Sequence, residues 1–197
     1  MKRSTKSEKE IVAELMAEAT SFAERCMVRS DRVPATLFID GVNGQKYFAA
    51  ENMSDEKARD EFADNSRLFC LANGAEAAVF VALARMNFTE KIGTAEATER
   101  ASEIVTRRQV VILMGETRQE WEQRVFMVNR AENGKYAGLV EAAESNAQAL
   151  KEYFGQFLTE DVPDERMRQE AERLLELKGV IWYSGPQRTH GATMARH

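Results

Sequence analysis

The feature that most constrains this chain is an uninterrupted apolar run, Ala77–Ala84, with a second one, Val110–Met114, further along. Neither run alternates polar with apolar residues, as a strand with one wet face does. Such runs are typical of strands that are covered on both faces. We therefore expect the centre of a sheet here, with helices packed on it.

Size and composition are those of a soluble globular protein. The chain has 197 residues, of which 44% are hydrophobic and 30% charged, which suits one ample core. We expect a single α+β domain over residues 1–183 and a flexible tail over 184–197. No apolar stretch approaches the roughly 20 residues that cross a bilayer, and the basic start lacks the apolar part of a secretory signal. These features predict a cytoplasmic protein that does not contact a membrane.

The first part of the chain reads as helix, hairpin, helix. Apolar residues at helical spacing predict an amphipathic helix over residues 7–29. Strand-like residues then flank Gly41–Gly44, which tolerates the backbone of a tight turn, so a hairpin is predicted. Ser54, followed by two acids, predicts the start of a second helix, and Asn73–Gly74 predicts its end.

The rest of the chain continues the sheet and then turns helical. We expect the central strand to run from Ala77 to about Phe88. Three antiparallel strands in sequence form a meander, in which Asn133–Gly134 is the strongest hairpin signal. The sheet core spans residues 35–143, and apolar spacing predicts two C-terminal helices over 145–178. Val180–Tyr183 is too apolar for a free tail and is expected to dock on the domain.

The predicted fold is therefore α+β, with a five-stranded antiparallel sheet, flanking helices and the order α-ββ-α-βββ-α-α. This order is similar to that of profilin-like folds, including the roadblock and longin groups, and the resemblance implies their layout. In sequence, the chain resembles a group of uncharacterised bacterial proteins, which implies a bacterial protein but supplies no catalytic residue. The stretches that carry this second resemblance are Val33–Phe38, Ala50–Met53, Ala63–Ala77, Ser102–Glu103 and Val110–Glu116.

Residues 88–108 form the odd segment, because they are charged and only weakly periodic. We expect a long loop here, and two interpretations stay open. The loop is either a solvated connector or a lid over a pocket. In the second case Glu103, Arg107 and Arg108 are the candidates for binding an anionic or polar ligand.

The sequence contains no recognisable catalytic set. Both histidines, His190 and His197, fall in the expected tail, so a serine or cysteine nucleophile lacks its usual base. Two cysteines and two histidines give no metal-ligand spacing, and the glycines form no phosphate-binding pattern, so we expect no metal and no cofactor. Glu116 near a strand end and Trp121 on a hairpin remain as candidate ligand contacts.

These observations predict a non-enzymatic regulatory or adaptor protein that acts through protein–protein contact, with a homodimer as one form. Exposed sheet edges and a surplus of apolar helix surface favour it. A net charge of −5 argues against nucleic acid as the partner. The alternative is a small-molecule binding protein or enzyme with a pocket under the 88–108 loop.

Overall fold

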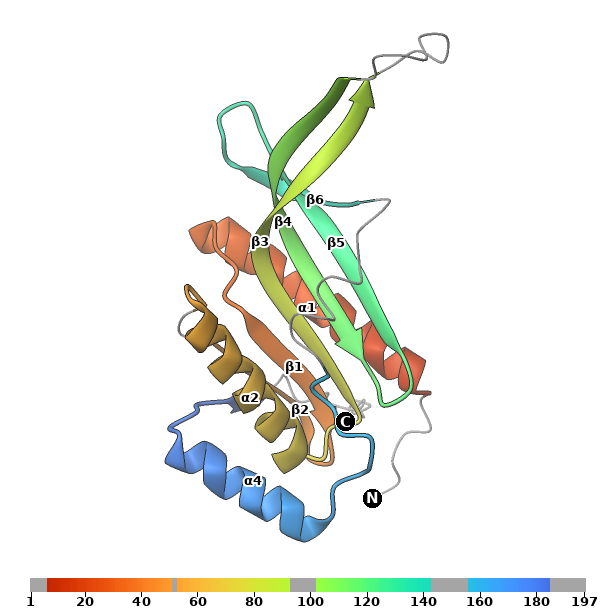
Figure 1. The fold of residues 1–197 in the computed structure, drawn as a ribbon, viewed down its shortest axis with the longest axis vertical. Coiled ribbons are helices and arrows are strands. Elements are labelled where there is room, and N and C mark those ends of the chain that lie inside the picture. Colours follow the sequence, from red (N-terminus) through yellow and green to blue (C-terminus); the bar gives the residue numbers. More distant parts are fainter. Residues whose placement is uncertain (1–6, 51–52, 93–101, 143–155, 185–197) are drawn as a thin grey trace, which may run out of the picture.

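The computed structural model describes residues 7–50, 53–92, 102–142 and 156–184. Within these ranges the protein is α+β, with one antiparallel sheet and three helices (Figure 1). None of the helices in this part of the chain is both long enough and apolar enough to cross a membrane.

The sheet has seven strands, so the prediction of five is wrong. Their order across the sheet is β6-β5-β4-β3-β1-β2-β7, and every neighbouring pair is antiparallel. The meander has four strands rather than three, and a two-residue strand after the last helix docks on the edge of β2. The strands are β1 Thr36–Gly41, β2 Gly44–Ala49, β3 Ala77–Ile92, β4 Ser102–Glu116, β5 Trp121–Arg130, β6 Tyr136–Glu141 and β7 Tyr183–Ser184.

Each helix begins at a residue whose side chain caps it. Helix α1 (Glu8–Ser30) starts with a capping box, in which Ser7 and Glu10 bond to each other's backbone amides. Helix α2 (Glu56–Ala72) is capped by Asp55 rather than by Ser54, and α4 (Glu165–Leu177) by Asp164. The predicted helices around α1, α2 and α4 are confirmed.

The other predicted C-terminal helix lies mostly outside the described residues, which resume at Gln156. Phe157 and Leu158, expected on its apolar stripe, are not helical. Both are nevertheless buried, so they belong to the core as predicted from their apolar character. The expected docking of the stretch before the tail also holds in part, because Tyr183 pairs with Tyr47 of β2.

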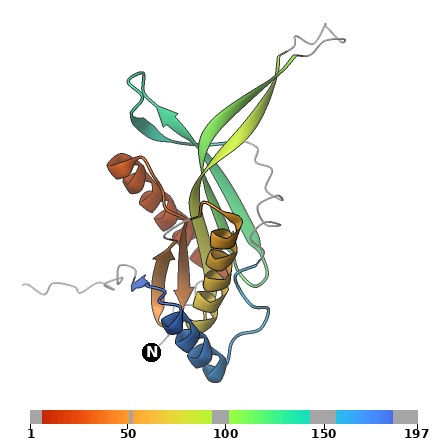
Figure 2. The same ribbon diagram turned by 60° about the vertical axis from the view of Figure 1, so that its left-hand side comes forward.

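Helices cover both faces of the sheet: α1 lies on one, and α2 with α4 on the other (Figures 1 and 2). Alternate residues of β3 point into the two resulting layers. Val79 and Val81 pack with α1, whereas Ala78 and Phe80 pack on the side of α2. The continuous apolar runs in β3 and β4 are therefore buried from both sides, as the sequence predicted.

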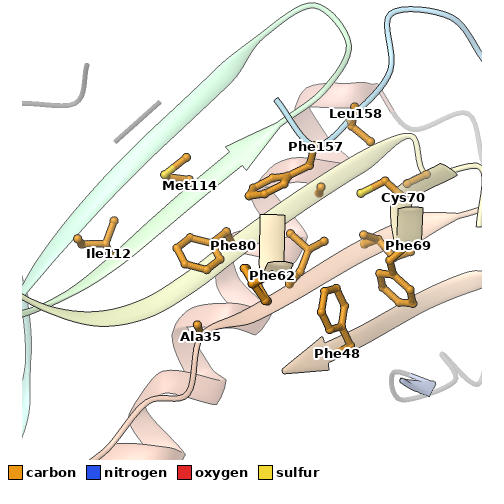
Figure 3. Close-up of a cluster of buried hydrophobic side chains, with 14 of the residues drawn as sticks. Ala35, Phe48, Phe62, Phe69, Cys70, Phe80, Ile112, Met114, Phe157 and Leu158 are labelled. Atoms are coloured by element: carbon orange, nitrogen blue, oxygen red, sulfur yellow. The ribbon is translucent and has the colours of Figure 1, made fainter. Parts of the chain in front are cut away.

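The layer on the side of α2 is built largely from aromatic rings (Figure 3). Phe62 of α2 lies between Phe48 and Phe80, with ring centroids 5.3 and 5.6 Å away. Phe157 contacts Phe80 at 6.2 Å and so joins the segment before α4 to the centre of the sheet. These tilted arrangements are the favourable ones for aromatic pairs.

The expected loop over 88–108 is wrong for the residues that the structure describes there. Residues 88–92 belong to β3 and 102–108 to β4, and the two strands pair without interruption as far as Ile92 and Ser102. Residues 93–101 lie outside the described ranges. The paired strands project well beyond the helices and away from the rest of the molecule (Figures 1 and 2).

Candidate functional site

The structure divides the five candidate residues between two places. Glu116 and Trp121 face each other as register partners where β4 turns into β5. Glu103, Arg107 and Arg108 lie in the projecting part of β4. Arg108 and Glu116 are eight positions apart along one strand, which is about 26 Å, so the five residues do not form a single site.

Glu116 holds a distant segment of the chain to the end of β4. Its side chain is buried, and Oε1 accepts hydrogen bonds from the backbone amides of Phe157 at 2.7 Å and Leu158 at 2.5 Å. A carboxylate that accepts two amide hydrogen bonds satisfies groups that burial would otherwise leave unpaired. Its observed role is therefore to fix the segment that leads into α4.

A small cavity lies beside Glu116, between the β4–β5 turn and the segment at Phe157. Trp121 forms part of its wall. Its volume is about 40 Å³, which is room for a few water molecules. Ligand pockets usually measure ~300–1,000 Å³, so this cavity does not accommodate a metabolite.

The thiols are not activated. Complete burial raises the pKa of Cys70 well above its usual value, and the nearby Glu116 raises it further against the opposing effect of Arg118. Burial also raises the pKa of Cys26, partly offset by Arg25 and Arg29. Both side chains therefore stay protonated at neutral pH, which disfavours nucleophilic attack.

The part of the chain that the structure describes contains no group of three or more histidine, cysteine or acidic residues placed to hold a metal ion. His190 and His197 lie outside these ranges, as does the whole predicted tail beyond residue 184. Neither the cavity beside Glu116 nor a larger groove beside α2 is lined by residues 88–108.

The second place is a two-stranded ribbon, which we call the arm: residues 85–92 of β3 and 102–109 of β4. Strand β1 pairs with β3 only as far as Val81, and β5 pairs with β4 only from Val110 onward. Beyond these points each strand has the other as its neighbour in the sheet. The arm thus spans eight residue pairs, from Arg85↔Gln109 to Ile92↔Ser102.

The arm has two chemically different faces. Met86, Phe88 and Arg108 share the face on the side of α2, where Met86 and Phe88 pack partly against the core. Arg85, Asn87, Val105 and Arg107 share the opposite face, and all four are exposed. Val105 is 60% exposed, more than any other large apolar strand residue whose exposure the structure describes.

The root of the arm is tied to the C-terminal end of α1. Arg130 of β5 donates from Nη2 to both carboxylate oxygens of Asp31, each at 2.8 Å, and to Oε1 of Gln109 at 2.7 Å. Asp31 is the C-cap of α1 and has a left-handed backbone, with φ of 55°. This contact links the innermost pair of the arm, Arg85↔Gln109, to the helical layer.

The sequence analysis selects Glu103, Arg107 and Arg108 from the β4 half of the arm, but as ligand contacts on a loop, and it gives the β3 half no role. Arg85 and Asn87 were included in the expected central strand and given no role. The available signal was that polar residues replace apolar ones at alternate positions after Ala84, which indicates that one face of the strand leaves the core there.

Comparison with known proteins supplies no identification, because the chain matches no protein-family model, no curated protein and no solved structure. The expected likeness to profilin-like folds therefore has no support from a solved structure.

Proposed function

We propose that the protein acts through contact with another protein chain and that the arm makes the contact. The observation that carries this proposal is that a two-stranded ribbon leaves the sheet, and that none of the other described strands pairs with it on either side. Among the side chains of the arm that the structure describes, the exposed ones include Arg85, Arg107 and Val105, which suit contact with another chain.

An isolated two-stranded ribbon is marginally stable in water, because it buries little apolar surface. The outer edges of the arm also present backbone groups that can pair with a further strand. A partner that adds a strand or covers a face supplies both the missing burial and the missing hydrogen bonds. Contact through the arm is thus the energetically natural use of this element.

The exposed face suggests what the partner offers. Arg85 and Arg107 are diagonal neighbours across the ribbon and favour carboxylates, while Val105, two positions before Arg107 on the same face, favours an apolar contact beside them. The chain itself carries a net charge of −5, so a second copy of it is an acidic partner. Self-association is therefore the first form of the proposal to test.

The experiment compares Val105→Glu in the arm with Val162→Glu outside it. Val162 is 75% exposed and lies before α4, so it is a matched control. Light scattering over a dilution series measures the mass of each protein. We expect the arm substitution to weaken association about tenfold or more, because a charge would be buried at the contact, and the control to leave it unchanged.

Three outcomes decide the proposal. Association that depends on Val105 supports it. If the chain is monomeric throughout, the same two variants are used as baits for partners from the native host, and a partner lost only with Val105→Glu also supports it. Association that is insensitive to the arm, or a monomer with no partner that depends on Val105, contradicts it.

A further inference from the structure

A groove separates the first half of α2 from the end of β2 and from the segment after α4. Its volume is about 560 Å³, within the usual ~300–1,000 Å³ of ligand pockets. The apolar part of its lining includes Phe48, Ala50, Phe62, Val180 and Ile181. The groove lies at the opposite side of β1 from the arm, so it is independent of the contact proposed above.

One face of α2 forms a wall of the groove. Ala58, Glu61, Phe62 and Asn65 follow the spacing i, i+3, i+4, i+7, which places them on a single helix face. Further along α2, Phe69 is covered by Trp182, with ring centroids 6.2 Å apart. The groove thus ends where Trp182 packs on the helix.

The opposite wall is held in place at both ends. The amide of Val180 donates to the carbonyl oxygen of Leu175 at 3.1 Å, which ties this wall to the end of α4. Tyr183 pairs with Tyr47, which ties it to the edge of β2. A wall fixed in this way preserves the groove when no ligand is bound.

Asn65 contributes the most informative polar group. Its Oδ1 is shielded from water and has no hydrogen-bond partner, which is unfavourable for a buried acceptor. The terminal torsion of asparagine is soft, so a rotation brings this oxygen toward a donor in the groove. Glu61 lies one turn earlier on the same face and adds a carboxylate within reach of the same donor.

We propose that this groove binds a small amphipathic amine. The ammonium donates to Asn65 and Glu61, and the apolar body lies along Phe48, Phe62 and Val180. An ammonium has three donors and one positive charge, which suits one amide oxygen beside one carboxylate. Lys178 on the other wall favours the orientation in which the ammonium faces α2.

Three probes with the same apolar body test the proposal: octylamine, octanol and octanoate. Each is titrated into the full-length, isotope-labelled protein while backbone amide resonances are recorded. We expect octylamine to bind most tightly and octanoate least, with shifts concentrated in residues 58–65 and 178–181. Shifts elsewhere, no shifts with octylamine, or octanoate binding as tightly as octylamine would overturn the proposal.

Two variants and a control separate recognition of the amine from general apolar binding. Glu61→Gln is expected to weaken the binding of octylamine about threefold, as for the loss of a solvent-exposed charge pair. The binding of octanol should not change. Asn65→Leu removes the unpaired oxygen, so it should preserve stability while abolishing the preference for octylamine over octanol. Glu172→Gln on the exposed side of α4 should change nothing. An unchanged preference in both groove variants would overturn the assignment.

Discussion

At the scale of single residues, one buried carboxylate holds the segment that leads into α4. The two amides that Glu116 binds lie 41 and 42 positions away in sequence. Their hydrogen bonds keep Phe157 against Phe80 and so close the aromatic layer. Both of these donors are backbone amides of the segment before α4.

Replacing this carboxylate tests its structural role. Glu116→Gln keeps one oxygen that can accept from both amides but removes the charge that strengthens both hydrogen bonds, so the free energy of unfolding should fall by about 1–3 kcal/mol. Urea denaturation followed by circular dichroism measures the change. Glu120→Gln, on the exposed turn nearby, is the control and should have little effect. Equal unfolding midpoints for the two variants would show that the amide contacts are unimportant.

The two cysteines give a second residue-scale prediction. Cys26 is half-buried on α1, whereas Cys70 is 2% exposed on α2 and its thiol pKa is raised well above the ordinary value by burial. Because alkylation requires an accessible thiolate, iodoacetamide should modify Cys26 first in the folded protein and Cys70 only in urea. Peptide mass spectrometry measures both rates. Faster modification of Cys70 without denaturant would contradict the burial described here.

The roles of individual residues were harder to predict from the sequence than whether those residues are buried. The apolar residues expected in the core at β3 and β4 are there, because a continuous apolar run exposes apolar side chains on both faces of its strand unless both faces are covered. Glu116 was identified as a candidate ligand contact, but its partners are amides brought close only by the tertiary fold. No local pattern marks such a contact.

At the scale of elements, α1 approaches β4 closely at Gly115. A Cβ at this position would lie 2.8 Å from Cγ1 of Val12 and 3.4 Å from Cε of Met16. Real Cβ atoms essentially never come as near as the first distance. The helix therefore lies at this height above the sheet because glycine leaves room for Val12.

This close approach predicts a pair of compensating substitutions. Gly115→Ala should lower the free energy of unfolding by about 1–3 kcal/mol through overpacking, and Val12→Ala in the same chain should recover part of that loss. A double-mutant cycle from urea denaturation measures the coupling. Strictly additive effects would contradict the contact between α1 and β4.

The structure of the arm explains why the sequence of residues 88–108 predicts a loop. Strand prediction depends on alternation, and alternation arises when one face is buried. In the arm one face is exposed and polar, and the other combines Met86 and Phe88 with Arg108. The periodic signal is therefore weak although the backbone pairing is regular. The helices, by contrast, each bury one face and were predicted well.

At the scale of the whole molecule, the fold combines a sheet covered on both faces with a projecting arm and an open groove. The α+β class, the antiparallel sheet and the central position of the apolar runs followed from the sequence. The number of strands did not, since the meander has four strands rather than three, and since β7 has only two residues and its pairing with β2 depends on where α4 ends.

The central claim is that the arm is the contacting element, and amide hydrogen exchange tests it most directly. Exchange is measured over residues 85–92 and 102–109 in dilute protein and at a concentration where light scattering shows association, or with an identified partner. We predict slower exchange in the arm of the associated protein, because its edges or faces become covered. Unchanged exchange in the arm, with protection appearing elsewhere, would contradict the account.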